Sequence, residues 1–208
     1  KNQTNAQLMA ILIIIVILCI VFLPGWWAKF VLKKYSETRP NMPGTGGELA
    51  IHLAQQCGLT EVSVERTDTG DHYDPMDKVV RLSEAVYDGK SLTAVTVAAH
   101  EIGHAIQDNI GYGPLQARTK LIGIAHFADL FGAIVLVSLP FVTAVARTPV
   151  SGAATFATGL AILLIPVLVH LVTLPVEFDA SFNRALPILH QRYIATEDMP
   201  AARSILRA

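Results

Sequence analysis

The chain has 208 residues, of which 52% are hydrophobic and only 16% are charged, and its formal net charge is −1. Its apolar residues are gathered into long uncharged blocks, and a soluble core of that size would need more polar chain to cover it than the remaining residues supply. The composition therefore excludes a wholly soluble protein and is typical of an integral membrane protein.

The first predicted element is a membrane anchor at the amino terminus. Residues 8–27 carry no charge, and about 20 apolar residues are enough for a helix to cross a bilayer. Two tryptophans end this run and three lysines follow it, as is typical of a membrane interface and a basic stop: Trp26, Trp27, Lys29, Lys33 and Lys34. A cleaved signal peptide is the alternative, but the apolar run is longer than usual and no Ala-x-Ala site follows it. We therefore predict a retained transmembrane helix over residues 1–28.

Residues 40–118 are the part of the chain that resembles a soluble domain, and we predict a small α+β catalytic domain there. Two segments have the residue pattern of strands, Glu61–Arg66 and Lys78–Ser83. The acidic segment between them, Asp68–Asp77, has the composition of a turn.

A helix is predicted over about residues 91–110, with Ser91 as its N-cap. It contains the sequence His100-Glu101-Ile102-Gly103-His104. Residues at i and i+4 share a helical face, so both imidazoles can converge on one zinc ion about 2.0–2.1 Å away. Glu101 lies roughly 100° around the helix from His100, where it can reach a water at the open position of the metal and act as general base.

The alternative is a chance match on an amphipathic helix with two surface histidines and a solvated glutamate. The flanking residues argue against it because they are apolar: Ala94, Val95, Val97, Ala98, Ala99, Ile102, Gly103, Ala105 and Ile106. An unpaired Glu101 would be costly to bury in such a helix. The motif therefore predicts a catalytic zinc site, where zinc acidifies a water to a pKa near 7 and polarises the carbonyl under attack.

Two further transmembrane helices are predicted, over residues 119–147 and 150–176. Leu130–Ala146 has no charged side chain, and between Thr148 and Val176 the only ionisable side chain is His170. Lysines and arginines follow the first and third spans, whereas only Arg147 lies between the second and the third. Because basic segments stay in the cytoplasm, residues 28 to about 120 and the tail are predicted to face that side.

A catalytic zinc site takes three protein ligands, so a third ligand must come from elsewhere in the chain. A metzincin is excluded, because its downstream glycine and histidine positions hold Gln107 and Ile110 here. The cytoplasmic segment 177–208 follows the third span and returns to the membrane face of the motif helix, so we predict Glu177 as the third ligand. The alternatives for this position are Asp179, His126, His170 and His190, and Asp179 is also a candidate for orienting a ligand.

The second predicted strand offers a way to hold a substrate. If Val79–Ser83 is a sheet edge beside the motif helix, an extended peptide can add to it by main-chain hydrogen bonds, with Val80 in the cradle. A hairpin that only covers the motif helix accounts for the same pattern equally well. His72 is a candidate for holding an oxyanion or a second metal, although Asp74-Pro75 nearby also begins a good turn.

Four separated motifs resemble, in the same order, those of the YugP-like bacterial membrane zinc metallopeptidases: Asp71–Pro75, Arg81–Ser83, Ala98–Gln107 and Glu177–Ser181. The resemblance covers residues 44 to 208. It implies a zinc-dependent integral membrane endopeptidase with one Zn²⁺, held by His100, His104 and Glu177, and with Glu101 as base. It also implies a bacterial inner (plasma) membrane location, where the orientation predicted from the basic residues makes the active site face the cytoplasm. Members of the family usually continue past Arg207 into another apolar helix, so we expect this chain to be truncated.

The segment from Glu177 to Ala180 is also similar to the Glu-x-x-Ala-Asp motif of the HtpX and CAAX-prenyl-protease group. In that group the aspartate supports the first histidine of the motif helix, and here Ser181 stands in its place. Asp179 or another residue must therefore orient His100, and we keep Ser181 as a candidate beside Asp179.

Three functions of different classes follow from these features. The first is a gluzincin-like membrane metalloendopeptidase that cuts membrane-associated proteins near the cytoplasmic face. Its expected partners are protein or peptide substrates, the lipid bilayer and a membrane adaptor protein, with no nucleic acid. The alternative is a proteolytically inactive, metal-binding membrane adaptor, against which the intact Glu101 argues. An intramembrane protease of the site-2 type would need an Asn-Pro-Asp-Gly-like motif, and the sequence has none.

Overall fold

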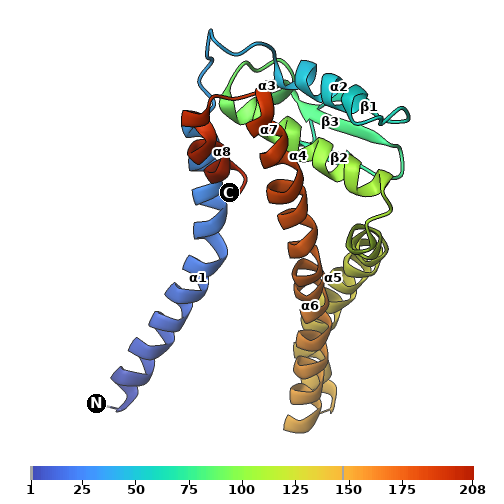
Figure 1. Cartoon of the computed structure of the whole chain (residues 1–208). Coiled ribbons are helices and arrows are strands. Elements are labelled where there is room, and N and C mark those ends of the chain that lie inside the picture. Colours follow the sequence, from blue (N-terminus) through green and yellow to red (C-terminus); the bar gives the residue numbers. More distant parts are fainter. Residues whose placement is uncertain (1, 147) are drawn as a thin grey trace. The chain divides into compact units, whose positions relative to one another are not determined.

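The computed structural model describes residues 2–146 and 148–208 (Figure 1). The chain forms two compact units: residues up to 106 together with 180–208, and residues 107–179. The described residues are mostly helical and include one three-stranded sheet, which confirms the predicted combination of a mainly α protein with a small sheet. Arg147, on which part of the predicted membrane orientation depended, lies outside the described residues.

The first unit begins with α1 (Asn2–Lys34), which includes the predicted anchor and has two lysines in its last turn. Its end is tied to the start of α4 (Leu92–Asn109), because Thr93 donates its hydroxyl to the Leu32 carbonyl at 2.8 Å and its N–H to the Tyr35 carbonyl at 3.1 Å. Val31 is buried in the core of this unit, whereas Phe22 is exposed. That α1 crosses a membrane stays a prediction.

Three short strands form one sheet in the order β1-β3-β2: β1 (Ser63–Thr67), β2 (His72–Asp74) and β3 (Val79–Ser83). β3 pairs in parallel with β1 and antiparallel with β2, so it is the central strand. The prediction that Val79–Ser83 is a sheet edge is therefore wrong, and so is the alternative of a hairpin between the two predicted strands. The reason is β2, which lies within the segment predicted as a turn and occupies the second side of β3.

The turn between β2 and β3 follows from the chemistry of Asp74. Its carboxylate accepts the backbone N–H groups of Met76 and Asp77 at 2.9 and 3.3 Å, and Lys78 then adopts a left-handed φ of 57°. Arg81 of β3 donates to the same carboxylate at 2.7 Å. Desolvation raises the pKa of Asp74, but the hydrogen bonds from Arg81, Met76 and Asp77 outweigh it, so the pKa lies below its ordinary value.

The buried centre of the first unit is α4. Ser91 caps this helix by accepting the Ala94 N–H at 3.1 Å, as the sequence predicted. Ile102 of α4 belongs to one hydrophobic cluster with Leu53 of α2 (Gly46–Gln56) and Leu189 of α7 (Leu186–Arg192). Burying each of these aliphatic side chains contributes about 1.5–3 kcal/mol. The helix that carries the motif is thus packed against residues that precede it and residues that follow it in the sequence.

Close packing also fixes the start of α2. Thr45 and Glu48 form a capping box, in which each side chain accepts the backbone N–H of the other residue. A Cβ atom on Gly46 would collide with the Val86 carbonyl oxygen of α3 (Glu84–Tyr87) and would lie 2.8 Å from the Ala94 carbonyl oxygen of α4. Glycine at this position therefore lets α2 approach both helices.

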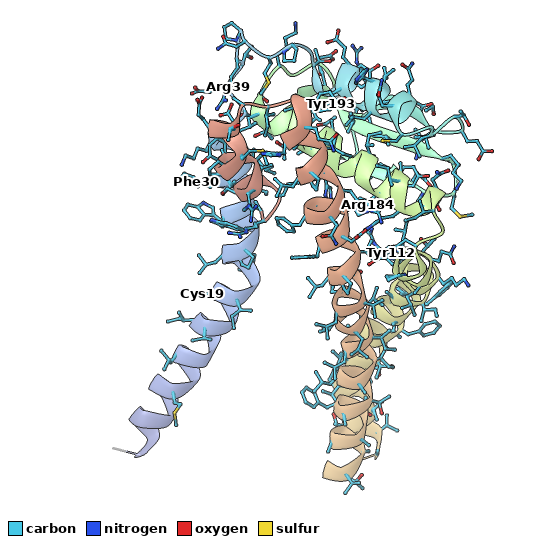
Figure 2. All side chains as sticks on the ribbon, viewed as in Figure 1. Cys19, Phe30, Arg39, Tyr112, Arg184 and Tyr193 are labelled. Carbon is cyan, nitrogen blue, oxygen red and sulfur yellow. The ribbon has the colours of Figure 1, made fainter. Side chains whose placement is uncertain are left out.

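After residue 180 the first unit is again helical. A π-helix, η1 (Asp179–Ala185), leads into α7, and a single 3₁₀ turn, η2 (Thr196–Asp198), precedes α8 (Met199–Ile205). Figure 1 shows α8 beside the end of α1, which it contacts. Arg39, which is labelled in Figure 2, forms an ion pair of 2.6 Å with Asp198 that joins the segment after α1 to this end of the chain.

The second unit consists mainly of two long helices packed against each other, α5 (Gly113–Ala146) and α6 (Pro149–Phe178). By length and composition, two helices of the described chain could cross a membrane, over Gly113–Ala146 and Val150–Gln191. Only 12% and 19% of their most apolar 18-residue windows are buried, whereas the core helix of a soluble protein would be mostly buried. These two helices fit the second and third predicted spans.

Candidate metal centre

The two histidines of the motif lie on one face of α4, one turn apart. Their Nε2 atoms are 3.2 Å from each other, and the two rings meet edge to face with centroids 4.6 Å apart. Two nitrogens that bind one tetrahedral zinc at 2.0–2.1 Å lie about 3.3–3.4 Å apart. The pair therefore fits a zinc ion, since both rings already turn the same nitrogen toward a common point.

Glu101 lies beside this pair in the buried part of α4. Its side chain is 6% exposed, and it makes no hydrogen bond or ion pair with any described residue. Its carboxylate oxygens are nevertheless not buried, so they reach solvent next to the two imidazoles, and this position indicates a chemical role. Such a group is suited to exchanging a proton with a small molecule bound at the histidines.

Ser181 lies next to His100, on the side of the ring away from His104. Its hydroxyl oxygen is 3.1 Å from His100 Nδ1, and its side chain is 2% exposed. One turn along α4, a Cβ atom on Gly103 would lie 2.8 Å from the Ala180 carbonyl oxygen, so the backbone of η1 approaches the motif helix closely at this point. The contact at Nδ1 leaves Nε2 of His100 facing His104, the orientation that metal binding requires.

Glu177 and its neighbours belong to the second unit. Glu177 Oε1 lies 3.2 Å from Arg118 Nη1, with both side chains partly exposed. Gln107, which is fully buried, donates its side-chain amide to the Val176 carbonyl at 2.8 Å and to the Asp179 carboxylate at 2.9 Å. Gln107 and Arg118 therefore hold the backbone and the side chain of the segment that carries Glu177.

The remaining predicted site residues lie in other surroundings. Val80 is fully buried on the central strand, where it pairs with Val64 and Tyr73, so it cannot accept a peptide strand as the predicted cradle required. His72 Nδ1 is 2.8 Å from the Gly70 carbonyl oxygen, and His72 belongs to no cluster of three metal-ligating side chains among the described residues. The alternative ligands His126, His170 and His190 are exposed.

Two residues of this region were not singled out from the sequence, Gln107 and Arg118. Gln107 contacts groups 69 and 72 residues further along the chain. The sequence signal for such a partner would have been a glutamine expected to be buried at the end of the motif helix, because a buried amide must be hydrogen-bonded. Nothing in the residues around Arg118 predicts its pairing with Glu177.

Comparison with known proteins agrees with this chemistry. The sequence model of a family described as "Putative neutral zinc metallopeptidase" matches residues 10–208. A protein of Bacillus subtilis (strain 168) described as "Putative membrane protease YugP" is 35% identical over 198 residues, which cover 88% of this chain and 81% of that protein. No solved structure matches the chain. Since the family match extends over nearly the whole chain and includes the histidine pair of α4, the chain belongs to this neutral zinc metallopeptidase family.

Proposed function

We propose that this protein is a zinc-dependent membrane endopeptidase in which His100 and His104 bind the metal and Glu101 is the general base. The observation that carries the proposal is the 3.2 Å separation of the two Nε2 atoms on a buried helix. Membership of the metallopeptidase family supports the reaction class. The substrate is a polypeptide, in keeping with that family.

Glu177 is the proposed third ligand. Three residues of α4 contact the segment around Glu177. His100 contacts Ser181, Gly103 lies against Ala180, and Gln107 contacts Val176. Glu177 is one helical turn before Ser181, the residue whose hydroxyl lies 3.1 Å from His100 Nδ1, and this closeness in sequence supports Glu177 as the ligand.

The donor set supports a zinc ion at this place. His100, His104 and Glu177 each offer one ligand atom and form the one group of three among the described residues that could hold a metal ion. Two imidazoles and a carboxylate are a known catalytic zinc set. Arg118 Nη1 lies 3.2 Å from Oε1 of Glu177. Ligating carboxylates commonly have such a hydrogen-bonded partner.

Each residue of the centre then has a defined task. When bound, zinc acidifies a water and polarises the carbonyl of the peptide bond that is cut. Glu101 accepts the proton of the attacking water on its carboxylate and delivers it to the leaving amine nitrogen. His100 keeps its proton on Nδ1 and donates it to Ser181, so that its Nε2 lone pair remains available as a ligand.

We further propose that residues 28 to about 120 and the tail face the cytoplasm of a bacterial cell, with the protein in the inner membrane. The exposed, free Cys57 allows a test, with Cys19 replaced by Ser. A membrane-impermeant thiol reagent should label Cys57 in inverted membrane vesicles and not in intact spheroplasts. Labelling in spheroplasts alone would show the opposite orientation.

The function is tested on the detergent-purified chain by measuring zinc content and casein cleavage together. Wild type should hold about one zinc per chain and cut casein, Glu101→Gln should keep zinc but lose cleavage, and Glu177→Ala should lose zinc. Glu197→Ala is a matched control, because Glu197 is an exposed glutamate of η2.

Two outcomes would contradict parts of this proposal. If wild type holds zinc but cuts neither casein nor peptides, the chain acts as a metal-binding adaptor for a partner protein. If Glu177→Ala keeps both zinc and cleavage, the third ligand is another side chain, with Asp179, His170 and His190 to be replaced next.

A further inference from the structure

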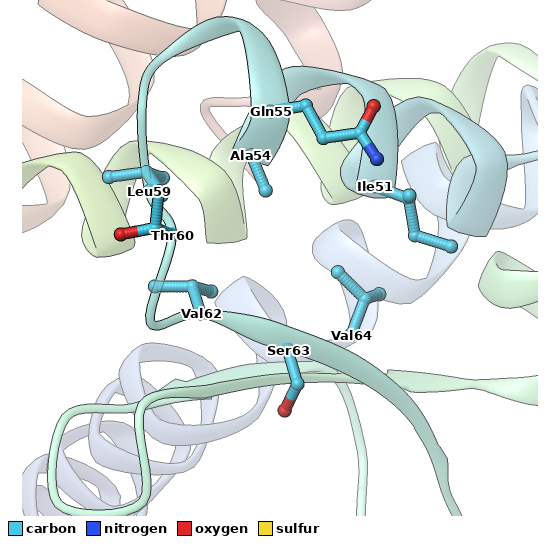
Figure 3. A pocket seen from close by; sticks show the side chains of 8 residues that line it. All are labelled: Ile51, Ala54, Gln55, Leu59, Thr60, Val62, Ser63 and Val64. Atoms are coloured by element: carbon cyan, nitrogen blue, oxygen red, sulfur yellow. The ribbon is translucent and has the colours of Figure 1, made fainter.

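A groove lies between α2 and β1 in the first unit (Figure 3), and none of the predicted metal-centre residues lines it. Its volume is about 470 Å³. Three residues of α2, the loop after it and the start of β1 line it, mostly with apolar side chains: Ile51, Ala54, Gln55, Leu59, Thr60, Val62, Ser63 and Val64. Ile51 on its rim is 41% exposed, although it is a large aliphatic residue.

The strand beside this groove is an edge of the sheet. Among the described residues β1 pairs only with β3, in parallel. The Ser63 N–H donates to the Lys78 carbonyl at 3.1 Å, so the main-chain groups of Ser63 point toward β3. Because these groups alternate in direction along a strand, the N–H and C=O of Val64 and Arg66 point away from the sheet. They are free to pair with one more strand.

The side chains of β1 divide into two kinds. Figure 3 shows Val62 and Val64 pointing toward α2, while Ser63 points the other way. Glu65 has the parity of Ser63 and is exposed, with no ion pair to any described residue, and Glu61 is exposed just before the strand. A strand added here would meet Val62, Val64 and Arg66 on one face, where Arg66 is paired with Asp88 at 2.7 Å, and the acidic Glu65 on the other.

We infer that this groove is a docking site for an extended segment of the protein substrate, distant from the bond that is cut. The segment adds to β1 as a further parallel or antiparallel strand, with aliphatic side chains in the groove and lysine or arginine side chains beside Glu65. Main-chain hydrogen bonds to an edge strand supply affinity, and pockets for every second side chain supply specificity for the sequence of the added strand. The inference rests on the proposed peptidase function.

The size of the site favours a substrate over a permanent subunit or a second copy of the chain. β1 has five residues, so the added strand is about as short. Stable protein complexes bury about 1,200–2,000 Å², far more than a pentapeptide on one edge can cover. Weak, reversible binding of this kind suits a segment that must leave after cleavage.

The direct test is binding of the fluorescein-labelled peptide Lys-Val-Lys-Val-Lys-Val-Lys to the full chain with Glu101→Gln, which keeps the peptide intact. Ile51→Arg and Glu65→Lys should each weaken binding by about tenfold or more, which corresponds to about 1.4 kcal/mol. Both replace exposed side chains, so folding should be unaffected, and melting temperatures verify this. Glu197→Lys, the same charge reversal on η2, should bind as tightly as the parent.

A peptide in which glutamate replaces every lysine should bind about tenfold more weakly to the parent, and Glu65→Lys should restore its binding. Equal binding of the lysine peptide to all variants overturns the docking site. If Ile51→Arg converts a dimer into a monomer in light scattering, a second copy occupies the groove and the substrate inference is overturned. Binding is measured without cleavage, so the two proposals can fail separately. If the chain binds the peptide as expected but never cuts casein, the proposed peptidase function is refuted and the docking site is not.

Discussion

Ser181 Oγ lies 3.1 Å from Nδ1 of His100 across 81 residues of sequence. The contact leaves Nε2 of that histidine directed at Nε2 of His104, 3.2 Å away. The Glu-x-x-Ala-Asp motif that residues 177–181 resemble ends in an aspartate, whereas here the neutral hydroxyl of Ser181 lies next to the ring. A neutral acceptor makes the imidazole a weaker base than a carboxylate would.

Replacing Ser181 by alanine should therefore lower zinc affinity. Partners of this kind typically change metal affinity by about 10–100-fold. Ser181→Asp should bind zinc at least as tightly as wild type, because a carboxylate accepts the Nδ1 proton more strongly. Competition with a fluorescent zinc chelator measures both. Equal affinities for wild type and Ser181→Ala would show that the hydroxyl only fills space.

Gly103 should not tolerate a side chain. A Cβ atom there would lie 2.8 Å from the Ala180 carbonyl oxygen, so Gly103→Ala must push the backbone of η1 away from α4. Ser181 follows Ala180 directly, so its hydroxyl would move away from His100 and zinc affinity should fall. This loss is expected although alanine favours a helix more than glycine does. Gly113→Ala is the matched control, since a Cβ atom at Gly113 meets nothing within 4 Å. A variant at Gly103 with wild-type zinc affinity would contradict this account.

Gln107 should be needed for stability. Gln107→Leu removes both donors and leaves the Val176 carbonyl and the Asp179 carboxylate without this amide. The loss of a donor to buried acceptors typically costs about 1–3 kcal/mol. The melting temperature in detergent should fall, and fall further for Gln107→Glu, which places a second carboxylate against Asp179. Gln116→Leu, at an exposed position of α5, is the control. Melting temperatures in the order Gln107→Leu below Gln107→Glu would refute the assigned contacts.

Acid should weaken the turn between β2 and β3. The pKa of Asp74 in the folded chain lies below its ordinary value of 3.8, so its carboxylate stabilises the fold fully above that value. The contribution is lost as the pH falls through the folded pKa. The melting temperature of wild type should therefore exceed that of Asp74→Asn at pH 7, and the difference should shrink below about pH 4. Asp68→Asn, exposed and outside the turn, should follow wild type throughout.

The parts of this protein that depend on neighbouring residues could be predicted from the sequence. His100 and His104 are four residues apart, and helix geometry alone places both on one face. The Ser91 cap of α4 and the apolar helices α5 and α6 follow in the same way, from a local hydrogen bond and from the length of uncharged runs. A strand over Lys78–Ser83 could also be predicted, because strand prediction depends on the pattern of side chains along a short segment.

Strand order was decided only by the tertiary structure. The sequence marks β3 as a strand but does not say which segments pair with it, and the three-residue β2 lay within a stretch whose composition is that of a turn. A strand of three residues makes too short a pattern to detect. Its pairing with β3 removed the predicted peptide cradle and left β1 as an edge.

The surroundings of the histidines were likewise decided by tertiary structure. In the first unit, Ser181 of η1 reaches His100 across 81 residues, and in the second unit, Gln107 reaches Val176 near the end of α6 across 69 residues. Spacing along the chain determines what a single helix presents. Which atoms then touch that helix depends on how distant segments pack, and no local pattern records it.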